Sequence, residues 1–173
     1  MSYRTFETER LYLRPVNETD AAFILTLFNS PSWRANIGER NVHTVEEAEN
    51  YIRVKMISQI ERLGFGNYTL SLKANGNKIG VCGLFDRPNL EGIDLGYALL
   101  DDYTAQGYAT EAAKCIMKAG LEDFHLDMLL AITKPSNKAS QRVLEKIGFS
   151  FKKNILLDGD TDELMLFSTE KKL

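Results

Sequence analysis

The chain has 173 residues, of which 44% are hydrophobic and 26% charged, and its formal net charge at pH 7 is -3. That length and mixture suit one globular domain and exclude a disordered or fibrous protein. The slight acidity argues against a general nucleic-acid binder, because such affinity rests mainly on lysine and arginine side chains that neutralise phosphates.

Signals for export, membrane insertion and metal binding are absent from the sequence. No apolar run reaches the roughly 18–20 residues that cross a bilayer, and residues 1–15 lack the apolar core of a signal peptide. We therefore expect a cytoplasmic protein. Cys82 and Cys115 are the only cysteines and form no Cys-x-x-Cys pair, so we expect free thiols. His43 and His125 are too few and too far apart to predict a metal site.

The first third of the chain predicts one strand followed by two helices. Alternating leucines predict a strand over residues 10–16. Acidic residues and helical apolar spacing predict a helix over 17–30, which ends at a proline. Residues 33–43 are typical of a loop or a short helical turn. A Thr-x-x-Glu capping box then opens a helix predicted over residues 44–62.

The rest of the chain predicts an alternation of strands and helices. The expected elements are a hairpin around Ala74–Asn77, a strand at Ile93–Leu100, a helix at Gly107–Phe124, a strand at Met128–Thr133, a helix from Asn137 that stops at Gly148, and strands over 150–158 and 163–169. We therefore predict a single α/β domain over residues 1–173, with a mixed sheet of about seven strands and about four helices. The strands on either side of the first of these helices should be parallel, because a helical crossover joins them.

Small residues gather where the strand Ile93–Leu100 runs into the next helix. A helix N-terminus has unpaired N–H groups and a positive dipole end, so it forms a ready phosphate site. Gly107 and Ala109 would let a phosphate approach the backbone closely. Neither GxxxxGK[ST] nor a GxGxxG that opens a helix occurs, which excludes a P-loop and a dinucleotide fingerprint. Tight packing of the helix on its sheet is the alternative interpretation.

A second helix start, at Asn137 and Ser140, follows the next strand. The carboxyl ends of neighbouring parallel strands lie at one edge of a sheet, where open α/β folds bind ligands. Taken alone, Asn137 is an ordinary N-cap residue.

Together the two junctions resemble the GNAT family of acetyl-CoA-dependent N-acetyltransferases. The family signature (Arg/Gln)-x-x-Gly-x-(Gly/Ala) aligns with Thr104–Ala109. The later family pattern aligns with Asn137, Ser140 and the Lys-x-Gly-Phe sequence at Lys146–Phe149. The segment Thr8–Ala21 also resembles the opening of the subgroup that contains the ribosomal-protein N-terminal acetyltransferases, so the resemblance covers nearly the whole chain.

Three positions depart from the family pattern. Thr104 stands where the family has Arg or Gln, and Ala105 replaces a usual glycine. If that position requires a positive φ, alanine costs on the order of 1 kcal/mol. Leu144 occupies the position of the tyrosine that protonates the leaving thiolate in many relatives.

The resemblance implies acetyl-CoA as the cosubstrate. Strand residues would pair with its pantetheine arm, and the helix start would hold its pyrophosphate. At the second junction, Asn137 would contact the pantetheine or the diphosphate, and Lys138 and Arg142 could meet a 3′-phosphate. The residues implied are Leu99 and Leu100 for pantetheine, Ala105, Gln106, Gly107, Tyr108, Ala109 and Thr110 for pyrophosphate, and Asn137, Lys138 and Arg142 at the second junction. For Lys138 and Arg142 a solvated helix face is the alternative, and Glu111 suits the helix dipole.

The resemblance also suggests catalytic groups. Asp94 is the first candidate for the general base and Glu91 the second, with a solvent-facing strand carboxylate as the alternative for each. Ser140 would orient or protonate the thiolate. Tyr97 and Tyr108 are further hydroxyls, for which core packing is the alternative.

The implied activity is acetyl transfer to a primary amine, by direct attack in a ternary complex. An α-amine with a pKa near 8 is about 10% neutral at pH 7, against about 0.04% for a lysine, which favours a protein or peptide N-terminus. Phe28, Trp33 and the loop through Arg40 would line the acceptor pocket, or simply pack. The alternatives are a small-molecule amine acetyltransferase and a non-catalytic acyl-CoA-binding module. Partners would be acetyl-CoA and the amine, and the chain would be a monomer or homodimer.

Overall fold

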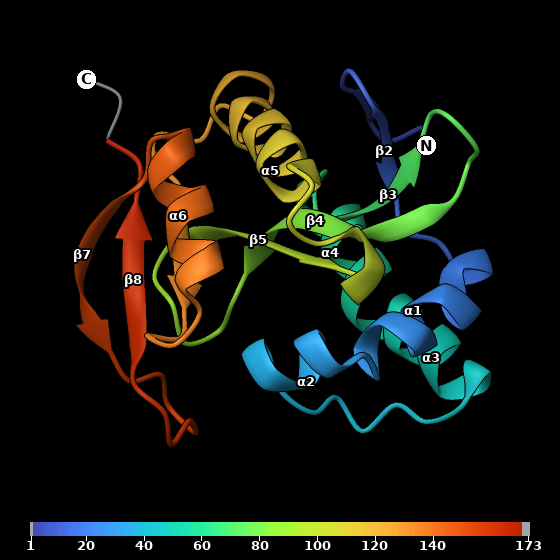
Figure 1. Ribbon diagram of the computed structural model, residues 1–173, viewed down its shortest axis with the longest axis horizontal. Helices are drawn as coiled ribbons and strands as arrows, with labels where there is room; N and C mark the ends of the chain where they lie inside the picture. Colours follow the sequence, from blue (N-terminus) through green and yellow to red (C-terminus); the bar gives the residue numbers. More distant parts are fainter. Residues whose placement is uncertain (1, 171–173) are drawn as a thin grey trace.

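The computed structural model describes residues 2–170. The chain folds into one mixed sheet with helices on both faces (Figure 1). The strand order is β1-β2-β3-β4-β5-β6-β8-β7. The strands are β1 Phe6–Glu7, β2 Leu11–Pro15, β3 Asn67–Leu72, β4 Lys78–Asp86, β5 Ile93–Leu99, β6 Leu130–Thr133, β7 Ser150–Ile155 and β8 Leu164–Ser168. The β5–β6 pair is parallel and every other pair is antiparallel.

The helices divide between the two faces of the sheet. The α-helices are α1 Ala21–Phe28, α2 Pro31–Asn36, α3 Val45–Tyr51, α4 Ser58–Leu63, α5 Tyr108–Lys118 and α6 Lys138–Ile147. Two 3₁₀ turns, η1 Glu18–Asp20 and η3 Asp101–Tyr103, and two π-helical segments, η2 Ile52–Ile57 and η4 Ala119–Asp123, extend or join them. Helices α1 to α4 cover one face, and α5 and α6 cover the other (Figure 1).

The predicted fold class and the parallel β5–β6 pair are confirmed. The capping box at Thr44 is present, and Gly148 ends α6 with a φ of 106°. The predicted strand count falls short by one, because the two-residue β1 is too short to show a period of alternation. The short helix α2 overlaps the start of residues 33–43, which were predicted to form a loop or a short helical turn. Ser30 caps it by accepting a hydrogen bond from the N–H of Trp33.

A buried carboxylate ties the first helical layer to the sheet. Asp20 is 0% exposed and accepts hydrogen bonds from Arg14 at 2.7 and 2.8 Å, while Lys78 lies 2.7 Å away and Thr69 donates at 2.9 Å. Burial alone would raise the pKa of Asp20, but these bonds outweigh it and hold that pKa well below its ordinary range. The contacts connect η1 to β2, β3 and β4.

Within residues 2–170, no helix is both long and apolar enough to span a membrane.

Candidate active site

Strands β5 and β6 part along most of their length. β4 pairs with β5 from Ile93 to Leu99, whereas β5 and β6 register only at Asp94 and Leu130. The N–H of Leu100 donates to the Ile79 carbonyl of β4 at 2.8 Å. Since backbone groups alternate sides along a strand, the peptide groups of Tyr97 and Leu99 point toward the gap. They are the strand groups open to a ligand.

A cavity of about 660 Å³ passes through this gap. It brings together most of the residues selected from the sequence. Those lining it are Asp94, Leu99, Ala105, Gly107, Ala109, Thr110, Asn137, Ser140 and Arg142. Those outside its lining are Glu91, Leu100, Gln106 and Tyr108.

The turn before α5 has the geometry that a bound anion requires. Ala105 has a φ of 57° and Gly107, the N-cap residue, a φ of 84°, so the positive φ considered from the sequence is present at both. No side chain caps α5, and no backbone or side-chain acceptor in the described part of the chain meets the N–H groups of residues 105–110. These N–H groups and the dipole of α5 form an open donor cluster beside the cavity.

The outer side of the turn is braced by Arg10 and Glu111. Glu111 accepts hydrogen bonds from Thr8 at 2.5 Å and from the Arg10 backbone and side chain at 2.8 and 2.7 Å. Arg10 also donates to the Gln106 carbonyl at 3.0 Å and lies 4.2 Å from the Tyr108 ring centroid. Burial acts to raise the pKa of Glu111, but these bonds outweigh it and lower that pKa. Gln106 and Tyr108 therefore support the turn from outside the cavity.

At the second junction, Asn137 is the N-cap expected from the sequence. Its side-chain oxygen accepts a hydrogen bond from the Ser140 N–H at 3.1 Å. The Ser140 and Tyr97 side chains interact, and both residues line the cavity. Burial raises the pKa of Tyr97, and its interaction with Ser140 offsets this only in part. Tyr97 packs against the core, and it also lines the cavity, as does Leu144.

Asp94 is buried, which excludes the alternative of a solvent-facing strand carboxylate. It is 1% exposed and accepts a hydrogen bond from the Nε of Arg87 at 2.8 Å. Burial raises its pKa and Arg87 opposes that shift, with a net increase. Glu91 instead lies in the exposed turn before β5, outside the cavity. Arg87 was missed, although the β4–β5 hairpin pairs the preceding Asp86 with Ile93.

Aromatic side chains enclose the cavity on the face covered by α1 to α4. Phe28 lies 4.5 Å from Trp33 and 5.0 Å from Tyr51 between ring centroids, and all three line the cavity. Arg40 lines it too. The contribution of the helix over Val45–Leu63 was not foreseen: it adds Tyr51, Lys55, Met56 and Gln59.

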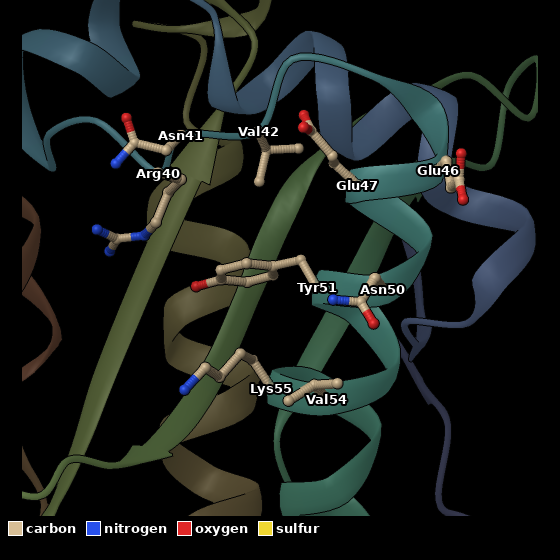
Figure 2. Close-up of a pocket in the computed structure, with 9 residues that line it drawn as sticks. All are labelled: Arg40, Asn41, Val42, Glu46, Glu47, Asn50, Tyr51, Val54 and Lys55. Carbon is tan, nitrogen blue, oxygen red and sulfur yellow. The ribbon is translucent and has the colours of Figure 1, made fainter.

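Two of these residues, Lys55 and Met56, lie in a π-helical segment. The i→i+5 bonding of η2 widens the helix between α3 and α4, and such segments are frequent at functional sites. A second hollow of about 390 Å³ lies beside the cavity and shares Arg40, Tyr51 and Lys55 with it (Figure 2).

Comparison with known proteins agrees with this geometry. The family model described as an acetyltransferase (GNAT) domain matches residues 10–150. The uncharacterised N-acetyltransferase p20 of Bacillus licheniformis is 26% identical, over 97% of each chain. The solved acetyltransferase of Agrobacterium tumefaciens has a TM-score of 0.83 at 24% identity, over 99% of this chain and 96% of that one. RimL, a ribosomal L7/L12 alpha-N-protein acetyltransferase in complex with coenzyme A, has a TM-score of 0.82 at 17% identity, over 98% of each chain.

Proposed function

The chain belongs to the GNAT family of N-acetyltransferases, and from that premise we propose that it moves the acetyl group of acetyl-CoA to the α-amine of a protein or peptide N-terminus. One observation carries the proposal. A single cavity runs from the unpaired N–H groups of residues 105–110, before α5, to the buried Asp94 through the gap between β5 and β6. RimL, which shares this fold, is named for transfer to a protein α-amine.

In this proposal the coenzyme lies along the face covered by α5 and α6. Its pyrophosphate accepts hydrogen bonds from the N–H groups of residues 105–110, and its pantetheine arm pairs with the Leu99 backbone. The Asn137 amide and Arg142 line the same path. Leu100 does not pair with the pantetheine arm in this proposal, because its N–H donates to Ile79 and its carbonyl accepts from the N–H of Tyr103.

The bound thioester supplies the carbonyl carbon that the acceptor amine attacks. Asp94, directly or through a water, removes the ammonium proton so that the nitrogen lone pair can form the C–N bond. The N–H group of Tyr97, which faces the gap, stabilises the oxyanion. The C–S bond then breaks, and Tyr97 gives its proton to the sulfur. The second proton of the attacking nitrogen leaves to solvent, which also returns a proton to Tyr97.

The acid role falls to Tyr97 in this mechanism because Leu144 cannot donate a proton. A tyrosine hydroxyl is a far stronger acid than the free hydroxyl of Ser140, and burial keeps Tyr97 protonated at neutral pH. Ser140 is then a positioning residue, whose side chain interacts with the Tyr97 phenol.

The test is release of free thiol from acetyl-CoA with a panel of amines. The panel contains short peptides with free α-amines, the same peptides blocked at the N-terminus but carrying a lysine, and small amines. Faster turnover of the free α-amine peptides supports the proposal. Turnover of small amines alone would instead support the small-molecule alternative, and acetyl-CoA binding without turnover of any amine would support the non-catalytic one.

A further inference from the structure

The acceptor end of the cavity, lined by Phe28, Trp33 and Arg40, carries an excess of positive charge. Among the described residues that line the cavity, Asp94 is the only carboxylate, against four cationic side chains, which are Arg40, Lys55, Arg87 and Arg142. Arg87 is already paired with Asp94 at 2.8 Å. Arg142, on α6, belongs to the face assigned to the coenzyme. Arg40 and Lys55 are therefore the cations left for the acceptor at this end of the cavity.

Arg40 and Lys55 are without carboxylate partners in the part of the chain that the structure describes. The Arg40 guanidinium lies 5.6 Å from the centroid of the Trp33 ring. Trp33 is 8% exposed, lines the cavity, and has a buried indole N–H with no acceptor among the described residues. A buried donor without a partner is costly, so this N–H points to a ligand oxygen at the same end of the cavity.

Arg40 and Lys55 both line the second hollow, which lies beside the main cavity. In Figure 2 the guanidinium of Arg40, the phenol oxygen of Tyr51 and the amine of Lys55 point to the same side. These three residues line both the hollow and the main cavity. Two carboxylates, Glu46 and Glu47, also line the hollow. Glu47 is occupied at the start of α3, where it accepts from the N–H groups of His43 and Thr44 at 2.6 and 3.1 Å. Figure 2 shows Glu46 on the side away from Arg40 and Lys55. A peptide whose amine reaches Asp94 and whose chain leaves through the hollow must pass Arg40 and Lys55.

We propose that the acceptor is an acidic N-terminus, with a side-chain carboxylate at its second or third residue that pairs with Arg40 and Lys55. This inference rests on the proposed transfer to an α-amine. It also disfavours polyamines and aminoglycosides, because like charges across an interface are repelled.

The experiment compares peptides that differ in one charge. Wild-type enzyme is assayed with Ser-Asp-Ala-Ala, Ser-Asn-Ala-Ala and Ser-Lys-Ala-Ala amides, with the same three residues at the third position, and with a matching series that begins with alanine. We expect kcat/KM for the aspartate peptides to exceed that for the asparagine peptides by about 10-fold, the ratio typical of a hydrogen bond to a charged group.

The variant Arg40→Met/Lys55→Met removes both charges while keeping long side chains. It should abolish the aspartate preference and leave the KM for acetyl-CoA unchanged. Arg53→Met is the matched control, since Arg53 lies in the same π-helical segment, pairs with Glu18 at 2.7 Å and is not part of the cavity lining. It should keep the preference.

Three results would overturn the inference: no aspartate preference in the wild type, a preference that survives the double variant, or a double variant whose only effect is a higher KM for acetyl-CoA. The last would assign the cations to the coenzyme. A small-molecule arm separates this inference from the proposed function. Turnover of γ-aminobutyrate over spermidine, with no peptide acetylated, refutes the N-terminal substrate and keeps the charge rule. Preference for spermidine refutes both.

Discussion

Asp94 and Tyr97 project from opposite faces of β5. They are three residues apart on one strand, whose side chains alternate between faces. Tyr97 packs with the core beneath α5 and α6, whereas Ala98, which shares a face with Asp94, packs with the core beneath α1 to α3. One cavity touches both side chains through the gap between β5 and β6. A base on one face and an acid on the other suit an amine and a thiolate that lie on opposite sides of the reacting carbonyl.

Removing the hydroxyl of Tyr97 tests the acid. Tyr97→Phe should lower kcat by about 100-fold, at the lower end of general acid catalysis, with little change in the KM for acetyl-CoA. Because burial raises the pKa of Tyr97, wild-type kcat should hold up to about pH 10 rather than fall earlier. Tyr103→Phe is the matched control, because Tyr103 lies outside the cavity lining. Equal activity of the two variants would remove Tyr97 from the mechanism.

Removing the charge of Asp94 tests the base. Asp94→Asn should lower kcat/KM by about 100-fold at pH 7. The base exists only above its folded-state pKa, which burial raises, so the wild-type rate should rise with pH through a value above the ordinary 3.9 or so. That acidic limb should vanish in the variant. Glu91→Gln, in the exposed turn, should have the kcat/KM of wild type. If Glu91→Gln lowered kcat/KM and Asp94→Asn did not, Glu91 would be the base instead of Asp94.

The backbone of Ala105 predicts a gain of stability on mutation to glycine. Its φ of 57° lies in the left-handed region, where alanine is strained. Ala105→Gly should therefore raise the free energy of unfolding by about 0.5–1 kcal/mol, a rise in Tm of roughly 2–4 °C for a chain of this size. Ala22→Gly, at an exposed position in α1, should have the opposite sign. Thermal unfolding of both variants tests this prediction, which is wrong if the two substitutions change the free energy of unfolding in the same direction.

The Asp20 cluster predicts a pH-dependent contribution to stability. The pKa of Asp20 is lowered in the folded state, so its contribution is present above the unfolded pKa of about 3.9 and is lost as pH falls through the folded value. Asp20→Asn should cost about 3–5 kcal/mol at pH 7, because it leaves Arg14 and Lys78 without their buried partner. The difference in free energy of unfolding between wild type and Asp20→Asn, measured by urea titration, should become smaller below about pH 4.

The neighbouring Glu18→Gln is the control for that experiment. Glu18 is about half exposed and pairs with Arg53 at the surface, so its substitution should change stability by at most about 1 kcal/mol at any pH. A gap between Asp20→Asn and wild type that is constant with pH would mean that the charge of Asp20 contributes nothing.

Local signals predicted most elements of this fold. Capping residues such as Thr44 and Asn137, the Asn75-Gly76 turn and the C-terminal glycine of α6 act over a few residues and can be recognised in a sequence. The donor turn at residues 105–110 could be predicted for the same reason, since it needs only small residues at a helix start.

Non-local pairing accounts for what sequence analysis missed. The parting of β5 from β6 depends on where two distant strands lose register, and no residue of either strand signals it. The burial of Asp94 and its contact with Arg87 follow from the helices that close that face and from the β4–β5 hairpin. Lys55, which lines the cavity, lies in the π-helical segment η2, and the apolar pattern did not indicate that segment.

Thermal unfolding with and without acetyl-CoA tests the central claim most directly, because it requires no knowledge of the acceptor. At a concentration about 100 times Kd, the coenzyme should stabilise the protein by about 2.7 kcal/mol, a rise in Tm of roughly 5–10 °C. Desulfo-pantetheine fragments that lack the pyrophosphate should give a smaller shift. No shift in Tm at millimolar acetyl-CoA would contradict the assignment of the cavity to this coenzyme.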